Sequence, residues 1–122
     1  MCTKKLLILD DDETIRFNMK LYLEDEGFEC TDAGDADSAL LLARKGGIAL
    51  SIVDLRLPGI NGEEYIKKSI VLNPEMKYLI HTGNTQYILS QELSDLGLNH
   101  EDVFYKPVES FEIIVNRIKQ HL

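Results

Sequence analysis

The chain has no tryptophan, two cysteines, three prolines and three histidines among its 122 residues. Cys2 and Cys30 are too few for a disulfide framework and lack metal-ligand spacing, so we interpret both as free thiols in a reducing cytoplasm. No hydrophobic run approaches the roughly 20 residues that cross a bilayer. The apolar run after Lys4 and Lys5 is short and ends in three aspartates, which excludes a signal peptide. We therefore expect a cytoplasmic protein with no membrane association.

Basic residues are also scarce, with 13 lysines and arginines against 21 acidic residues and a net charge of −8. This balance argues against direct nucleic-acid binding, which depends on phosphate neutralisation. It suits a divalent cation or a basic partner surface, although a merely solvated acidic surface is the commoner meaning. The histidines at 81, 100 and 121 are scattered, and we assign none of them a metal-binding or catalytic role. The length predicts one domain over residues 1–122.

Strand-like and helical patterns alternate along the chain. Short apolar runs predict strands at residues 6–9, 28–31, 48–53, 77–81 and 103–105. Between and after them, apolar residues at helical spacing predict helices. The expected core faces of these helices are Ile15, Met19 and Tyr22 or Leu23; Ala36, Ala39, Leu40 and Ala43; Tyr65, Ile66 and Ile70; Ile88, Leu89, Leu93 and Leu96; and Phe111, Ile114, Val115, Ile118 and Leu122. The alternation favours right-handed βαβ units and hence an α/β fold with a parallel sheet.

Polar side chains follow four of the predicted strands at the points where they end. Asp10–Asp12 follow the first strand, Asp54 follows the third, Thr82 and Gly83 mark the end of the fourth, and Lys106 follows the fifth. The carboxyl ends of parallel strands meet at one edge of a sheet, where ligands bind. We therefore expect these groups to converge.

The converging groups suit a divalent cation and a phosphoryl group. Crowded carboxylates repel unless a cation intervenes, and Mg²⁺ often uses one or two carboxylates plus a phosphate oxygen. Asp54 would accept a phosphoryl group as an acyl phosphate, with Lys106 supplying a neutralising charge and Thr82 a hydrogen bond. Each residue alone also has an ordinary explanation, such as a capped turn or an exposed lysine before a proline. The ordered set is more specific than its parts.

With these residues the chain resembles the receiver domain of bacterial two-component response regulators over essentially its whole length. Residues 6–13 are similar to the acidic-pair strand of that family, and residues 52–62 to its phosphoacceptor strand and Pro-Gly loop. Residues 81–83 match its hydroxyl-bearing strand end, and residues 105–107 its lysine-proline turn. The resemblance implies a flavodoxin-like three-layer sandwich, with a five-stranded parallel sheet of order 2-1-3-4-5 and five helices.

The resemblance also implies how the strand ends act. Asp54 would take a phosphoryl group from a histidine of a sensor kinase or phosphotransfer protein. The side chains of Asp11 and Asp54 would ligate Mg²⁺, Asp10 would help mainly through water, and the Arg56 carbonyl would add a backbone ligand. The protein would be a phosphoacceptor switch rather than a turnover enzyme, with self-catalysed phosphoryl transfer and autodephosphorylation only.

The implied switch has further partners. Thr82 and Lys106 would bind the phosphoryl oxygens and pass the signal to the face made by the fourth helix, the fifth strand and the last helix. That face would engage a downstream partner or an output domain, and a phosphorylation-dependent dimer is a further expectation. No output segment follows Leu122, so the sequence leaves open a stand-alone regulator or a fragment whose output domain was removed.

Three features depart from the family pattern, and one is the slightly longer stretch at residues 98–102 before the fifth strand. The family usually has Tyr or Phe three residues before the lysine, where this chain has Val103. Tyr105 has the same strand parity and is a candidate replacement, whereas Phe104 points to the other face. Arg56 stands two residues after the acceptor, and we hypothesise that its charge or bulk tunes the hydrolysis lifetime by pairing with phosphate or excluding water.

Two other functions stay open. The start of the chain also fits the first motif of haloacid-dehalogenase-like phosphatases, with Asp10 as nucleophile, Asp12 as acid/base and Thr14 as an auxiliary. That interpretation leaves Asp54 and its Pro-Gly loop unexplained, and it needs a further strand ending in an acidic pair after Lys106. The second alternative is a pseudo-receiver, a non-phosphorylated interaction module. Such a module would be expected to lack part of the set of residues that this chain contains.

Overall fold

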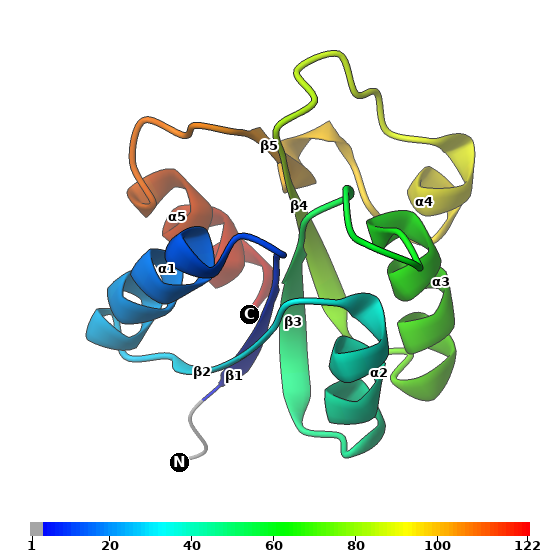
Figure 1. Ribbon diagram of the computed structural model, residues 1–122, viewed down its shortest axis with the longest axis horizontal. Helices are drawn as coiled ribbons and strands as arrows, with labels where there is room; N and C mark the ends of the chain where they lie inside the picture. Colours follow the sequence, from blue (N-terminus) through cyan, green and yellow to red (C-terminus); the bar gives the residue numbers. More distant parts are fainter. Residues whose placement is uncertain (1–3) are drawn as a thin grey trace.

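The computed structural model describes residues 4–122 as a parallel sheet covered by helices on both faces (Figure 1). The strands are β1 (Lys5–Leu9), β2 (Glu29–Ala33), β3 (Ile48–Val53), β4 (Lys77–Thr82) and β5 (Val103–Tyr105). They pair in the order β2-β1-β3-β4-β5, and every pairing is parallel. This confirms the predicted sheet. It also places β2 at an edge of the sheet.

The helices form the two outer layers. They are α1 (Glu13–Asp25), α2 (Ala36–Arg44), α3 (Gly62–Leu72), α4 (Gln91–Asp95) and α5 (Glu112–His121), with a 3-10 turn, η1 (His100–Asp102), before β5. Helices α1 and α5 cover one face of the sheet, and α2, α3 and α4 cover the other (Figure 1). The three-layer α/β sandwich is therefore confirmed. Within residues 4–122, none of these helices has the length and apolar character needed to cross a membrane.

The sheet separates two hydrophobic clusters. Leu7 and Leu9 of β1 join the cluster on the α2–α4 side, and Leu6 and Ile8 join the cluster on the α1/α5 side. Successive strand residues point to opposite faces, so a strand with helices on both sides must be apolar at every position. This is why β1 is a continuous apolar run. The polar residues that follow it lie at the carboxyl edge of the sheet.

Side-chain caps fix the chain as it leaves this edge. The Asp12 carboxylate accepts hydrogen bonds from the backbone N–H groups of Thr14 and Ile15 at the start of α1. Asp35 and Asn61 cap α2 and α3 in the same way. Such caps satisfy amides that have no partner inside the helix. The short loops between strand ends and helices are thereby held in place.

Helix α4 is shorter than its apolar spacing predicted. Ile88 and Leu89 lie outside it, and Ile88 is 85% exposed. The Ser90 hydroxyl accepts a hydrogen bond from the N–H of Leu93, so the helix begins at Gln91. The prediction was wrong here because a cap, rather than hydrophobic periodicity, decides where the helix starts.

The remaining differences concern the ends of elements. Strand β2 begins and ends later than predicted, at Glu29–Ala33. In α1, Leu23 is fully buried, whereas Tyr22 is partly buried and packs edge-on against Phe111. Leu122 lies beyond the end of α5 and is 41% exposed, so it is not a core residue.

Candidate functional site

Two buried carboxylates lie at the ends of adjacent strands. Asp10 follows β1, and its N–H donates to the carbonyl of Ala33 at 3.1 Å; Asp54 follows β3, and its N–H donates to the carbonyl of Leu9 at 2.8 Å. Asp10 is 2% exposed and Asp54 is 5% exposed, whereas Asp11 is exposed. One carboxylate oxygen from each of these three aspartates lies within 4.8 Å of the others. The sequence-predicted acidic cluster is therefore assembled.

The side chain of Lys106 joins the two buried carboxylates. Its Nζ donates to Oδ2 of Asp10 at 2.8 Å and to Oδ2 of Asp54 at 3.2 Å. Its backbone N–H donates to the carbonyl of Thr82 at 2.7 Å, which ties the end of β5 to the end of β4. Residues separated by as many as 96 positions thus meet at one edge.

The charges in this cluster are not balanced. Burial raises the pKa of the Asp54 carboxyl, and the nearby charge of Asp10 raises it further, against the lowering effect of Lys106. Burial alone would lower the pKa of Lys106, but its hydrogen bonds and charge interactions with Asp10 and Asp54 raise it. The single ammonium of Lys106 therefore pairs with two buried carboxylates, and the carboxylate of Asp11 lies close to both. A further cation would favour the ionised form of Asp54.

The donor set suits a hard divalent cation. Mg²⁺ binds oxygen at about 2.1 Å, so the ligands around an octahedral ion lie about 3 to 4 Å apart. One oxygen from each of the three carboxylates lies within 4.8 Å of the others, close enough for a single ion to reach them together. Asp10 already uses both oxygens, accepting from the N–H of Asp12 at 2.9 Å and from Lys106. Asp54 likewise accepts through both oxygens, from the N–H of Arg56 and from Lys106, so these contacts do not divide the aspartates into direct and water-mediated ligands.

Thr82 and Arg56 are the two remaining predicted site residues. Thr82 is fully buried at the end of β4, and its hydroxyl oxygen accepts from the N–H of Asn84 at 3.1 Å. Arg56 is exposed in the loop after β3, and its backbone N–H donates to Oδ1 of Asp54 at 3.2 Å. Both predicted residues therefore stand at the same edge, with the arginine side chain toward solvent.

Gly62 lets helix α3 begin directly against the Asp54 backbone. Its N–H donates to the carbonyl of Leu55 at 3.1 Å. A Cβ at position 62 would overlap the carbonyl oxygen of Asp54 and would lie 2.8 Å from the Leu55 Cα and 2.9 Å from a Val53 methyl group. Only glycine permits this approach. The start of α3 therefore helps to fix the position of the end of β3.

His81 also lies in this region, although we expected no metal-binding or catalytic role for it. It precedes Thr82, is 4% exposed, and neither ring nitrogen has a hydrogen-bond partner within residues 4–122. Burial, with the nearby charge of Lys106, lowers its pKa to about 4. The imidazole is thus neutral at neutral pH. A histidine inside an otherwise apolar strand was the only sequence signal for this unusual environment.

The residues around the departure at position 103 alternate as their strand parity predicts. Val103 packs against the cluster on the α2–α4 side, and Phe104 packs against the cluster on the α1/α5 side. The Tyr105 hydroxyl donates to the backbone carbonyl of Tyr87 at 2.7 Å. Tyr105 therefore contacts the loop between β4 and α4.

Cys30 is a buried free thiol, as expected, and burial raises its pKa to about 12. At neutral pH it is therefore protonated and a poor nucleophile. The prediction for Cys2 falls outside the described residues. Cys30 is not part of the acidic cluster.

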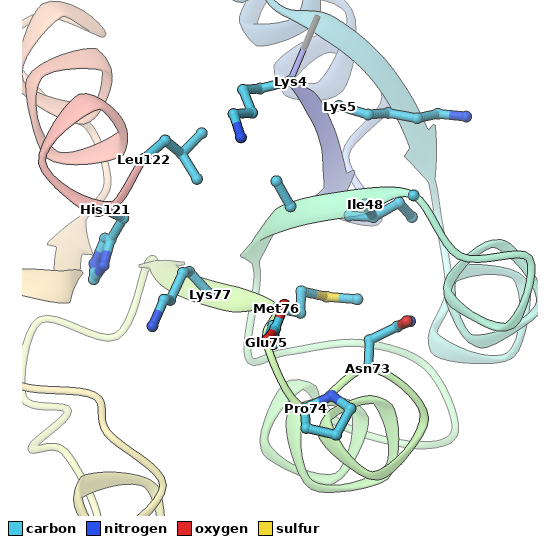
Figure 2. A pocket seen from close by; sticks show the side chains of 12 residues that line it. Lys4, Lys5, Ile48, Asn73, Pro74, Glu75, Met76, Lys77, His121 and Leu122 are labelled. Atoms are coloured by element: carbon cyan, nitrogen blue, oxygen red, sulfur yellow. The ribbon is translucent and has the colours of Figure 1, made fainter. Parts of the chain in front are cut away.

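A separate cavity of about 780 Å³ lies at the opposite edge of the sheet. It is lined by the amino ends of β1, β3 and β4 and by the end of α5, with Lys4, Lys77 and His121 around it (Figure 2). All five strands run parallel, so this cavity and the acidic cluster are separated by the length of the sheet. The predicted site residues thus lie at the carboxyl edge and do not line this cavity.

Comparison with known proteins adds a sequence relationship to this geometry. The family described as "Response regulator receiver domain" matches residues 6–119. Sporulation initiation phosphotransferase F of Bacillus subtilis (strain 168) is 31% identical over 114 residues, covering 93% of this chain and 90% of that protein. Response regulator GtcR of Aneurinibacillus migulanus is 30% identical over 120 residues, which cover 98% of this chain but 48% of that protein. The chain thus spans about half the length of this second relative.

Solved structures agree with these sequence matches. A CheY-like receiver domain protein from Methanospirillum hungatei JF-1 has a TM-score of 0.81 and 32% identity, covering 98% of this chain and 93% of that one. The response regulator TrrA from Thermotoga maritima, crystallised in complex with Mg²⁺ and BeF, has a TM-score of 0.84 and 27% identity. That match covers 98% of this chain and all of the TrrA chain.

Proposed function

Since the chain belongs to the response regulator receiver domain family and is a receiver domain of two-component signalling, we propose that Asp54 is its phosphoacceptor. The observation that carries this proposal is the contact of one ammonium, Lys106 Nζ, with the buried carboxylates of Asp10 and Asp54. The third carboxylate, Asp11, lies in the same cluster. A buried acceptor beside a fixed cation and a set of oxygen ligands is the arrangement that phosphoryl transfer to a carboxylate requires.

The reaction follows from the groups in place. A carboxylate oxygen of Asp54 attacks the phosphorus of a phosphohistidine, the phosphorus–nitrogen bond breaks, and an acyl phosphate forms. Lys106 neutralises charge on the phosphoryl oxygens, and Thr82 turns its hydroxyl to donate a hydrogen bond to one of them. Bound Mg²⁺ would supply further positive charge to these oxygens. Asp11, Asp54 and the carbonyl of Arg56 would hold the ion, with Asp10 assisting through water.

This activity makes the protein a switch rather than a turnover enzyme. The donor is a sensor histidine kinase or a phosphotransfer protein, and the acyl phosphate is lost again by autodephosphorylation. Thr82 and Lys106 each precede segments that lead to the face made by α4, β5 and α5. Phosphorylation shifts the population of that face toward a state that binds a downstream partner or an output domain, or that dimerises. A cytoplasmic location goes with these partners.

The alternative of a haloacid-dehalogenase-like phosphatase is not favoured by the geometry. Among residues 4–122, only helix α5 follows Lys106, so that part of the chain contains no later strand with an acidic pair. Asp12, the acid/base of that hypothesis, uses its carboxylate to cap α1. Asp54, which the hypothesis leaves without a role, lies in the centre of the cluster instead.

Site-specific phosphorylation tests the proposal. The protein is incubated with acetyl phosphate and Mg²⁺, and the gain of one phosphoryl group is measured by intact mass and located after borohydride reduction. We expect labelling of Asp54 that Asp54→Asn abolishes and that EDTA suppresses. Asp37→Asn, which changes an exposed carboxylate on α2, is the matched control and should label normally. Labelling of Asp10 would support the phosphatase instead.

The pseudo-receiver alternative predicts no labelling at all. Beryllofluoride with Mg²⁺ mimics the acyl phosphate without a kinase, so it separates a slow acceptor from an inert one. Because the chain has no tryptophan, backbone amide spectra are a better measure of binding than intrinsic fluorescence. Saturable shifts at residues 54, 82 and 106 support the receiver, and unchanged spectra would establish the inert module.

A further inference from the structure

Arg16 links the acidic turn after β1 to the edge strand β2. Its Nη1 donates to the backbone carbonyl of Asp10 at 2.7 Å, and its Nε donates to Oδ2 of Asp32 at 3.0 Å. The Arg16 side chain is 18% exposed and that of Asp32 is 32% exposed. One guanidinium therefore holds a main-chain atom of the cation site and a carboxylate from the neighbouring strand at the same time.

Neighbouring residues on α1 and after β2 leave room for this guanidinium and share its contacts. Arg16 and Lys20 are one turn apart on α1, and both face Asp32, with Lys20 Nζ 3.4 Å from Oδ1. Gly34 follows β2, and a Cβ there would lie 2.9 Å from Nη1 of Arg16. The backbone beyond β2 thus leaves room for the planar group to reach the carbonyl of Asp10.

The carbonyl of Asp10 belongs to the peptide that joins Asp10 to Asp11. A hydrogen bond to this oxygen fixes the orientation of that peptide plane, and with it the direction in which the exposed Asp11 side chain leaves the backbone. The same turn is held on its other side by the N–H of Asp12, which donates to Oδ1 of Asp10 at 2.9 Å. Both contacts act before any cation arrives.

We propose that Arg16, anchored by Asp32, is a positioning residue that preorganises the Asp10–Asp11 turn for divalent-cation binding. This inference rests on the proposed Mg²⁺ site. Arg16 does not touch the ion; it acts through the Asp10 carbonyl. A rigid turn loses less conformational entropy when the ion binds, and residues that orient metal ligands typically change affinity when they are replaced.

The charge of Arg16 and its hydrogen bond to Asp10 predict opposite effects of its replacement on Mg²⁺ affinity. If its positive charge were all that mattered, its removal would tighten binding of Mg²⁺, because like charges repel. If position matters, loss of the hydrogen bond to Asp10 weakens binding. Lysine keeps the charge but lacks the planar fork that reaches two acceptors at once. Arg16→Lys therefore separates the two effects without removing a charge.

The test is a Mg²⁺ titration of the full chain, measured by calorimetry and by amide shifts of residues 10–12 and 54. We expect Arg16→Ala and Arg16→Lys each to raise the Kd about tenfold, the scale of effects from residues that orient metal ligands. Lys20→Gln is the matched control, since Lys20 shares Asp32 but does not contact Asp10, and its Kd should stay within about twofold because exposed pairs contribute little. Asp32→Asn should give an intermediate loss.

Hydrogen exchange gives a readout that needs no cation. The Asp12 amide should exchange faster in Arg16→Lys than in the wild type or in Lys20→Gln, because the turn that it closes is less constrained. Equal or tighter Mg²⁺ binding by both Arg16 variants would overturn this inference alone. A wild-type chain with no saturable Mg²⁺ binding would overturn the proposed cation site, and the inference with it. Wild-type binding that the Arg16 variants weaken supports both.

Discussion

The hydroxyl of Tyr105 donates a hydrogen bond to the backbone carbonyl of Tyr87 at 2.7 Å. Tyr105 directly precedes Lys106, and Tyr87 lies in the loop that follows Thr82. The hydroxyl of Tyr87 in turn donates to Oε1 of Glu63 at 3.4 Å, near the start of α3. These contacts connect the ends of β4 and β5 with the loop before α4. Val103 stands where we expected an aromatic residue from the family pattern, and it has no hydroxyl. Tyr105 makes this link instead.

Tyr105→Phe tests this link. The substitution removes one hydrogen bond of a side chain that is 40% exposed, so the free energy of unfolding should fall by about 1 kcal/mol or less. Amides of residues 83–90 should exchange faster, and their shifts on beryllofluoride binding should shrink. Tyr22→Phe, on the α1/α5 side of the sheet, is the control. Unchanged exchange and shifts in the loop would rule out Tyr105 as the coupling residue.

Gly62→Ala should disturb the acceptor without touching its carboxylate. The added methyl group would overlap the carbonyl oxygen of Asp54, and overpacking of this kind costs about 1 to 3 kcal/mol. We expect a lower melting temperature and slower labelling by acetyl phosphate. Gly83→Ala is the control for stability, because a Cβ there meets nothing within 4 Å. Normal labelling of Gly62→Ala would contradict the close packing of α3 against the Asp54 backbone.

Asp102 anchors the start of β5 to α5 on the side of the sheet away from the cation site. It is fully buried, and its Oδ1 accepts from Arg117 Nε at 2.8 Å and contacts His121 Nε2 at 2.6 Å. Removing one partner of a buried ion pair leaves the other unpaired. Asp102→Ala should therefore lower the free energy of unfolding by about 3 kcal/mol. Asp95→Ala on α4, an exposed carboxylate, should change it by less than about 0.5 kcal/mol.

The same carboxyl predicts a pH dependence. Burial alone would raise the pKa of Asp102, but hydrogen bonds from Arg117, from the N–H of Asn99 and from His121 lower it below the ordinary value of 3.8. A lowered folded-state pKa stabilises the protein above the unfolded-state value, and this contribution is lost as the pH falls through the folded-state pKa. The free energy of unfolding, measured in urea, should fall as the pH drops below the ordinary aspartate pKa of 3.8. This fall should be smaller in Asp102→Ala than in the wild type. Parallel profiles would be inconsistent with this assignment.

The sequence pattern was sufficient to predict a parallel sheet with its polar strand ends at one edge, whereas the strand order came from the family resemblance. Continuous apolar runs and helical spacing require the βαβ order, and parallel strands bring the residues after them to one edge. Asp10, Asp54 and Lys106 could therefore be grouped without coordinates. The start of α4 at Gln91 was missed, because apolar periodicity at Ile88 and Leu89 outweighed the cap at the next residue.

Polar contacts outside the cluster of Asp10, Asp54 and Lys106 were not predicted from the sequence. Arg16 and Asp32 are 16 positions apart, and nothing in either segment indicates that they are partners. The link from Tyr105 to Tyr87 has the same character, because its acceptor is a backbone carbonyl in a loop. Periodicity gives the face on which a side chain lies, but loop conformation determines which acceptor it reaches.

Arg56 is expected to set the lifetime of the acyl phosphate. Its backbone N–H is bound to Oδ1 of Asp54, while its side chain is exposed beside the acceptor. A guanidinium there would pair with a phosphoryl oxygen or block an attacking water. Arg56→Asn removes both effects, so the rate of autodephosphorylation should rise about fivefold, equivalent to about 1 kcal/mol of activation free energy. The measurement is the decay of phosphoprotein mass after the donor is removed.

Two further substitutions separate charge from bulk at position 56. If charge pairing slows hydrolysis, Arg56→Lys keeps the long lifetime and Arg56→Met loses it; if exclusion of water is the cause, Arg56→Met keeps it. Added salt should shorten the lifetime only in the first case, since exposed charge pairs are screened. Arg44→Asn, at the end of α2, controls for the general loss of a positive charge. A half-life of Arg56→Asn equal to that of the wild type would show that the side chain has no part in hydrolysis, leaving only the backbone of residue 56 in contact with the acceptor.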